Sequence, residues 1–383
     1  MRKIIKIVLI FFISLQFKLN AAPNIEVRTA ILMDYDSGKI IYELNPDMEI
    51  YPASMTKIMT TIIAFELLNE DEISLDDTSI VSERAWHMSQ KGYSSMFIMV
   101  NDEVTIEELL RGIIVVSGND ACVALAEAIA GTEENFVEMM NEKAGEIGMT
   151  NTNFGNSSGI QHLDNYSTVK DIALMSQYLI KNFPELYKIY KEKEFTWYRT
   201  GGDPITQGNR NGLLYRNIGA DGIKTGYLNA EKYSLASTIK KGNRRLISVG
   251  SGFETKNKRT KESIKLLSWG FRNTETYKIS IKEETFFDIK TWLGKKETLK
   301  AFSKEDLFVT VPKKDIKKVK VFLEYTGPIK APILKNEEVA KLRVVNDKEV
   351  IKEVSLYSAE DIEKINFFKS VFTSLNYMIW GDV

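Results

Sequence analysis

Apolar and polar residues along the first two thirds of this chain follow two different periods. Alternating apolar residues predict strands at 27–34 and 39–45, and the residues YDSG between them predict the turn of a hairpin. Apolar residues spaced three or four apart predict helices, which start at Ser54 and near residues 105, 120, 167 and 258. Strand patterns with turns between them return after Gly222. This mixture predicts an α+β domain in which helices pack on an antiparallel sheet.

The pattern changes after Tyr277. Short alternating runs with charged turns predict a small all-β domain, a β-sandwich over 278–359. Helical spacing then returns, and we expect residues 361–380 to form an amphipathic helix that lies on a membrane surface, within an anchor segment 360–383. Lys364 and Lys369 interrupt any membrane-spanning run. The apolar stripe consists of Ile365, Phe368, Phe372, Leu375 and Ile379, widened by Phe367, Val371 and Met378.

The N-terminus has the features of a targeting segment. Basic residues at 2, 3 and 6 precede an apolar run from Ile7 to Phe17, and Ala21 and Ala22 follow. Because this run is short for a bilayer span, residues 1–21 are interpreted as a secretory signal peptide, with an uncleaved anchor as the alternative. In either case the protein leaves the cytoplasm, and the first folded domain is predicted to cover 22–277.

Composition narrows the chemistry that the chain can perform. The 383 residues carry a net charge of −1, so nothing indicates a nucleic-acid partner. The single cysteine, Cys122, excludes an intramolecular disulfide and a cysteine-rich zinc site. His87 and His162 lie in no local signature of a Ser-His-Asp triad, so both are interpreted as surface or hydrogen-bonded residues. We expect neither a metal nor a cofactor.

Ser54 and Lys57 lie three residues apart where the first long helix is predicted to begin. This spacing places both side chains on one face of a helix, close to its free backbone N–H groups. A serine hydroxyl is a weak nucleophile that needs a base, and a neutral lysine can serve as one. Burial or a second nearby cation would favour the neutral form. The pair alone is weak evidence, because many helices contain a capping serine and a solvated lysine.

Two further motifs strengthen the interpretation of this pair. Ser117, Gly118 and Asn119 lie between two predicted helices, where a short loop can project a hydroxyl and an amide into a cleft. Lys224 and Thr225 lie on a predicted strand and suit a substrate carboxylate, and Gly226 after them leaves the backbone open to an extended substrate. Each motif alone is also typical of an ordinary turn or edge strand.

Together and in this order, S-x-x-K, S-x-N and K-T-G are the signature of penicillin-binding proteins and class A β-lactamases. The chain resembles the D-alanyl-D-alanine carboxypeptidases, which are low-molecular-mass penicillin-binding proteins. The segments ASMTKIMT, RGIIVVSGNDACVALAE, YKEKEFTW, NRNGLLY, DGIKTGY and LLSWGF carry this resemblance, which covers nearly the whole chain. It implies a penicillin-binding-protein/β-lactamase-like domain followed by a β domain and an amphipathic helix.

The resemblance also implies roles for individual residues. Ser54 would be the acylated nucleophile and Lys57 its proton partner. Ser117 would pass a proton on, and Asn119 would hold the substrate amide. The substrate would be the pentapeptide stem of peptidoglycan, from which the last D-alanine is removed, and β-lactam antibiotics would acylate the same serine. Such an enzyme takes part in cell-wall remodelling and cell shape, at the periplasmic face of the bacterial inner membrane.

The remaining implied roles concern recognition of the substrate. Lys224 would supply positive potential, and Thr225 would contact the terminal carboxylate, with Gly226 beside it. The backbone N–H groups of Ser54 and Tyr227 would form the oxyanion hole. Arg259, in KRTKES, matches an arginine that assists carboxylate recognition.

The chain departs from the family pattern just after K-T-G. Leu228 replaces a usual threonine, and Glu231 and Lys232 stand where alanine and glycine are usual. A charged pair there could alter the substrate groove or the rate, which leaves a non-catalytic cell-wall scaffold as one alternative. A β-lactamase on the same scaffold is another, although the E-x-x-L-N run of the class A enzymes is not found here.

Overall fold

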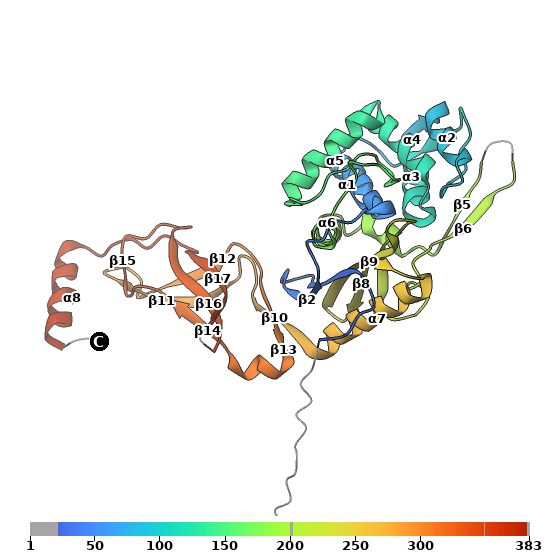
Figure 1. The fold of residues 1–383 in the computed structure, drawn as a ribbon. Coiled ribbons are helices and arrows are strands. Elements are labelled where there is room, and N and C mark those ends of the chain that lie inside the picture. Colours follow the sequence, from blue (N-terminus) through green and yellow to red (C-terminus); the bar gives the residue numbers. More distant parts are fainter. Residues whose placement is uncertain (1–21, 200–201, 348, 381–383) are drawn as a thin grey trace, which may run out of the picture.

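The computed structural model describes residues 22–199, 202–347 and 349–380, which form an α+β domain and a smaller β domain (Figure 1). The predicted signal peptide, 1–21, lies outside the described residues. Helix α7, Lys256–Asn273, leads directly into β10, Thr274–Ser280, and so connects the two parts.

A five-stranded antiparallel sheet forms the centre of the first domain. Its strand order is β2-β1-β9-β8-β7, and every neighbouring pair is antiparallel. The predicted hairpin is confirmed as β1 and β2, and β7 lies at the other edge of the sheet. The strands are β1 Thr29–Asp34, β2 Ile40–Leu44, β7 Ala220–Leu228, β8 Lys232–Lys241 and β9 Arg244–Phe253.

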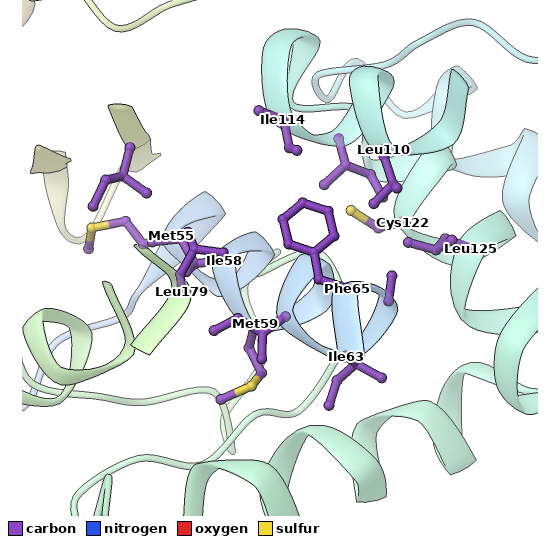
Figure 2. Packing of buried hydrophobic residues seen from close by; sticks show 14 of the residues in the cluster. Met55, Ile58, Met59, Ile63, Phe65, Leu110, Ile114, Cys122, Leu125 and Leu179 are labelled. Atoms are coloured by element: carbon purple, nitrogen blue, oxygen red, sulfur yellow. The ribbon is translucent and has the colours of Figure 1, made fainter. Parts of the chain in front are cut away.

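Helices cover both faces of this sheet. Side chains of β1 alternate: Ile31 belongs to the large core with the N-terminal helices, whereas Leu32 packs in a second cluster with Leu266 of α7. In the large core, Phe65 of α1 lies close to Cys122 and Leu110 (Figure 2). The helices are α1 Lys57–Asn69, α2 Glu83–Gln90, α3 Ile106–Arg111, α4 Asn119–Ala130, α5 Glu133–Ile147 and α6 Val169–Asn182.

Local signals explain several element boundaries. Thr105 caps α3, with a reciprocal bond from Glu108, as the sequence spacing predicts. The helix does not continue regularly to residue 116, because residues Gly112–Val116 form a π-helical turn. Two short antiparallel strand pairs complete the domain, β3 Thr78–Ile80 with β4 Glu103–Thr105, and β5 Glu194–Trp197 with β6 Ile205–Gly208.

The β domain contains two sheets. β10 pairs with β13, and the other six strands form a sheet in the order β14-β16-β17-β12-β11-β15. The α+β class and the all-β character of the second part are thereby confirmed. The strands are β11 Thr285–Trp292, β12 Thr298–Ser303, β13 Leu307–Pro312, β14 Val319–Glu324, β15 Ile329–Lys330, β16 Glu338–Asn346 and β17 Glu349–Ser358.

The terminal helix α8, Phe367–Trp380, lies at the end of the β domain that is far from the first domain (Figure 1). It starts later than the apolar stripe predicts, because the preceding residues pair with the β domain: Ile362 is buried against Ile333, and Ile365 N–H donates to the Leu293 carbonyl. No residue of α8 is buried. Within the described part of the chain, no helix is both long enough and apolar enough to cross a bilayer.

Candidate active site

A short turn before α1 brings Ser54 to the cleft of the first domain. Ser54 lies in a short 3₁₀ turn, Ala53–Thr56, that continues into α1. Ala53 before it has a φ of 50°, which is unfavourable for a residue with a side chain. Gly159 packs against this bend, and a Cβ there would lie 1.9 Å from the Ala53 carbonyl oxygen. The backbone before Ser54 is thus held in an uncommon conformation by close packing.

Lys57 is completely buried below Ser54. Its Nζ lies 3.3 Å from Ser54 Oγ and donates to Asn119 Oδ1 at 2.6 Å and to the Ser158 carbonyl at 2.5 Å. A neutral amine has two N–H bonds and one lone pair. With both N–H groups donated to Asn119 and Ser158, the lone pair is left for the hydroxyl of Ser54.

Burial favours this neutral form. It lowers the pKa of Lys57, and the nearby Arg210 guanidinium lowers the pKa further, although Asp120 acts in the opposite direction. Lys224 is also buried, and burial together with the Lys57 charge lowers the pKa of Lys224 well below its usual range. Two neighbouring lysines in a desolvated site do not readily both carry a proton, so one of them titrates at lower pH.

Ser117 and Asn119 lie opposite Ser54, where the π-helical turn ends and α4 begins. Ser117 has a φ of 68°, and the N–H of Gly118 closes the turn on the Gly112 carbonyl at 2.9 Å. Asn119 is the first residue of α4, and its backbone N–H donates to the Ser94 carbonyl at 2.8 Å. The left-handed residue reverses the chain so that both side chains reach the same cleft.

Strand β7 supplies the third side of the cleft. Lys224, Thr225, Gly226 and Tyr227 follow one another along it. As the edge strand of the sheet, β7 has backbone groups that an extended peptide can pair with. A Cβ on Gly226 would lie 3.1 Å from Ala53 Cβ, so close packing against the turn that carries Ser54 is a further reason for glycine here.

These elements enclose a cleft of about 880 Å³. Arg210 and Arg259 add positive charge to it. Arg259 donates to the Arg210 carbonyl at 3.0 Å, and its guanidinium lies 5.7 Å from the centre of the Tyr233 ring. The Arg259 Nε is buried and has no hydrogen-bond partner in the described structure. The cleft is suited to an extended anionic ligand.

Comparisons with known proteins agree on one family. The family model described as D-alanyl-D-alanine carboxypeptidase matches residues 16–255, and the model of the penicillin-binding protein 5 C-terminal domain matches residues 275–364. The D-alanyl-D-alanine carboxypeptidase DacA of Haemophilus influenzae is 38% identical over 94% of this chain and 91% of its own length.

The chain belongs to the D-alanyl-D-alanine carboxypeptidase family. Solved structures agree with this assignment. Penicillin-binding protein 5 from Haemophilus influenzae aligns with a TM-score of 0.83 and 39% identity over 90% of this chain and 99% of that one. Penicillin-binding protein D2 from Listeria monocytogenes, solved in a cefotaxime-bound form, aligns with a TM-score of 0.59 and 27% identity over 66% of this chain and 99% of that one. The resemblance stated from the sequence motifs is confirmed.

The structure brings together all the residues that the sequence singled out for the carboxypeptidase site. Lys57 and Lys224 are buried behind the cleft surface. His87 and His162 are exposed and do not line the cleft. Among the described residues, no cluster of three His, Cys, Asp or Glu side chains could hold a metal. The predicted site residues that line the cleft are Ser54, Ser117, Asn119, Thr225, Gly226, Tyr227 and Arg259.

Sequence reasoning missed groups that hold this site together. The Asp120 carboxylate is buried and accepts N–H bonds from Met96 and Phe97, each at 2.8 Å, so it fixes the loop beside the cleft. Its position directly after S-x-N was the available signal. Ser158 contributes a carbonyl oxygen, which no side-chain pattern reveals. Arg210 could have been found in NRNGLLY, a segment that the resemblance already includes.

The two departures from the carboxypeptidase pattern lie in different surroundings. Leu228 lines the cleft, whereas Glu231 does not. Glu231 lines a separate depression with Arg28 and Lys258. Lys232 has a φ of 62°, the left-handed conformation that a glycine adopts without strain. The expected effect of Glu231 on the groove would therefore have to be indirect.

Proposed function

We propose that this protein is a serine-type D-alanyl-D-alanine carboxypeptidase that releases the last D-alanine from peptidoglycan pentapeptide stems and that β-lactams acylate. The observation that carries this proposal is the geometry around Lys57. A fully buried lysine donates two hydrogen bonds away from Ser54 and has its third position 3.3 Å from Ser54 Oγ. This is the arrangement that a lysine base requires.

In the first step, Ser54 Oγ attacks the carbonyl carbon of the penultimate D-alanine, and the hydroxyl proton moves to neutral Lys57. The negative charge on the carbonyl oxygen is stabilised by the backbone N–H groups of Ser54 and Tyr227. The C–N bond then breaks, and the leaving amine receives a proton from Lys57 by way of Ser117. Water hydrolyses the resulting ester, with Lys57 again taking a proton.

The positive charge of the cleft recognises the negatively charged end of the stem. The terminal carboxylate is attracted by the positive charges of Lys224, Arg259 and Arg210. The Thr225 hydroxyl contacts the same carboxylate. The peptide extends along the edge of β7, while Asn119 contacts its amide. Burial without a paired carboxylate lowers the pKa of Lys224, so the approach of an anionic substrate favours its charged form.

We infer that the protein is exported and is held at the periplasmic face of the inner membrane by its C-terminal segment. Helix α8 presents Phe367, Phe368, Phe372 and Trp380 with 73–84% of their surfaces exposed. These large apolar side chains have no partner in the described structure that covers them. A membrane surface would bury them, and the β domain would then hold the active site away from the bilayer.

The direct test measures D-alanine released from a synthetic stem that ends in D-alanyl-D-alanine. We expect release by the purified protein and none by Ser54→Ala. Activity that persists in Ser54→Ala, or a purified protein that binds the peptide without releasing D-alanine, would contradict the proposal. Turnover of penicillin faster than that of the peptide would favour the β-lactamase alternative.

A further inference from the structure

Glu231 is a buried carboxylate to which the family pattern gives no role. Only 2% of its surface is exposed, and it lies in the turn between β7 and β8. In this position the family usually has alanine, which can neither accept a hydrogen bond through its side chain nor carry charge. A carboxylate is costly to bury unless its oxygen atoms are satisfied.

Both carboxylate oxygens of Glu231 have partners from distant parts of the chain. Oε1 accepts the Ser251 hydroxyl at 2.6 Å and pairs with the Arg28 guanidinium. Oε2 accepts the backbone N–H of Tyr51 at 3.2 Å. A Cβ on Gly252 would lie 2.5 Å from Arg28 Cβ, so glycine allows Arg28 to pack beside the carboxylate. Glu231 therefore connects β9, the start of β1 and the segment before α1.

The contact with Tyr51 fixes the backbone that leads to the nucleophile. Tyr51 is three residues before Ser54, and Pro52 between them has no N–H to donate. Ala53 then adopts its left-handed conformation with a φ of 50°. Such a conformation persists only when neighbouring contacts hold it. Gly159 packs on one side of this segment, and the bond from Tyr51 to Glu231 restrains it at its start.

Glu231 also acts at the end of β7, through its backbone and through Ser251. The backbone N–H of Glu231 donates to the Leu228 carbonyl at 3.2 Å, which closes the turn directly after Tyr227. Ser251, which donates to Glu231, also lies 3.2 Å from the Ser234 hydroxyl, and Ser234 pairs with Gly226 across β7 and β8. The Glu231 side chain thus restrains the Ser54 segment directly through Tyr51, and the Tyr227 segment indirectly through Ser251 and the neighbouring Ser234.

We propose that Glu231 is a positioning residue that sets the distance between the backbone N–H groups of Ser54 and Tyr227. This inference rests on the proposed function, in which these two groups stabilise the oxyanion. Such donors act only if their positions are fixed before the reaction, and a displacement of about 1 Å can cost about a hundredfold in rate. The Arg28 cation reduces the cost of burying the Glu231 carboxylate, but it contacts neither the Ser54 N–H nor the Tyr227 N–H.

The experiment compares wild type, Glu231→Ala and Glu231→Gln with Asp34→Asn as a matched control. Asp34 is also a fully buried carboxylate and pairs with an arginine, Arg244, but it lies outside the cleft. The rate of acylation by penicillin is measured per molecule that finally becomes labelled, so unfolded molecules do not contribute. kcat, KM and the pH profile of D-alanine release are measured in parallel.

We expect Glu231→Ala to lower the acylation rate and kcat by about tenfold to a hundredfold. KM and the rising part of the pH profile should stay unchanged, because the contacts of Lys57 are intact. Glu231→Gln should recover part of the rate, since its amide oxygen can still accept the Tyr51 N–H. Asp34→Asn should lose thermal stability but keep the wild-type acylation rate.

Equal acylation rates for wild type and Glu231→Ala, or equal losses in Glu231→Ala and Asp34→Asn, would overturn the positioning role. If Glu231→Ala does not fold, Glu231→Gln decides: its acylation must be slower than that of wild type, and amide exchange in a peptide covering residues 50–58 must be faster. If Glu231→Gln changes neither the acylation rate nor the amide exchange of residues 50–58, the positioning role is also overturned. Failure of penicillin to label wild-type Ser54 would instead show that the proposed function is wrong.

Discussion

The two domains use charged side chains in opposite ways. In the first domain, Lys57 and Lys224 are buried at the cleft, and neither forms an ion pair in the described structure. In the β domain, the buried polar residues that the structure describes are uncharged. Its lysines pair in solvent instead, as in Lys295 with Glu363, whose side chains are 62% and 71% exposed.

This difference indicates that the first domain is less stable than it could be because its active site buries unpaired lysines. A lysine buried without an ion partner lowers the free energy of unfolding, because it must give up either its proton or the hydration of its charge, whereas an exposed ion pair changes that free energy little. The left-handed residues Ala53 and Ser117 add backbone strain beside the same two lysines. Lowered lysine pKa values beside strained backbone in a cleft are typical of an active site.

The largest expected effect comes from replacing the proposed base. Lys57→Arg keeps the positive charge but cannot become neutral, so we expect D-alanine release to fall by at least about a hundredfold. The measurement is kcat on a stem peptide, and circular dichroism serves as the control for folding. An active Lys57→Arg would show that Lys57 does not accept the proton.

The second largest effect is expected on membrane binding when helix α8 is removed. A chain that ends at Asn366 keeps Ile362 and Ile365 in the β domain but lacks α8. We expect the mature full-length protein to sediment with inner membranes at low and high salt, because apolar burial dominates its binding. The shortened protein should be soluble and keep penicillin labelling. A soluble full-length protein, with its signal peptide shown to be removed, would contradict the anchor.

A smaller effect is expected in the pH dependence. Because burial lowers the pKa of Lys57, its neutral form increases as pH rises, so activity should rise through an apparent pKa below the usual lysine value of about 10.4. Arg210 lowers this pKa further, so Arg210→Gln should move the rising part of the profile to higher pH. A profile with no rising part below about pH 10 would exclude a titrating lysine base.

The smallest effect is expected at an ion pair of the β domain. Lys341 and Glu353 lie 2.9 Å apart, and their side chains are 50% and 34% exposed. Lys341→Ala should change neither the unfolding midpoint nor the acylation rate measurably, since solvent screens such pairs. A clear loss of stability in Lys341→Ala would show that exposed ion pairs do stabilise the β domain. The contrast with the buried lysines of the first domain would then be weaker than proposed.

The sequence predicted what depends on local pattern. Alternation and turn residues predicted the hairpin of β1 and β2, and apolar spacing predicted a helix that starts near residue 105, where α3 begins. The motif spacings selected Ser54 and Lys57. In the fold, Lys57 Nζ lies 3.3 Å from Ser54 Oγ. The residue types in these motifs already determine which chemistry is available.

Other features depend on contacts between distant segments. The Ser158 carbonyl that accepts a bond from Lys57 is 101 residues away, and the Tyr51 N–H that reaches Glu231 is 180 residues away. From the sequence, Glu231 was expected to act on the groove beside it, yet its side chain is buried outside the cleft. Helix α5 was not predicted, although its N-cap at Thr132 was a usable signal.

The most direct test of the central claim is mass spectrometry of the protein after brief exposure to penicillin, followed by mapping of the modified peptide. We expect one added penicillin per molecule, attached to Ser54, and no addition to Ser54→Ala. A penicillin adduct on another residue, or addition to Ser54→Ala at the wild-type stoichiometry, would contradict the assignment of Ser54 and Lys57 as the reacting pair.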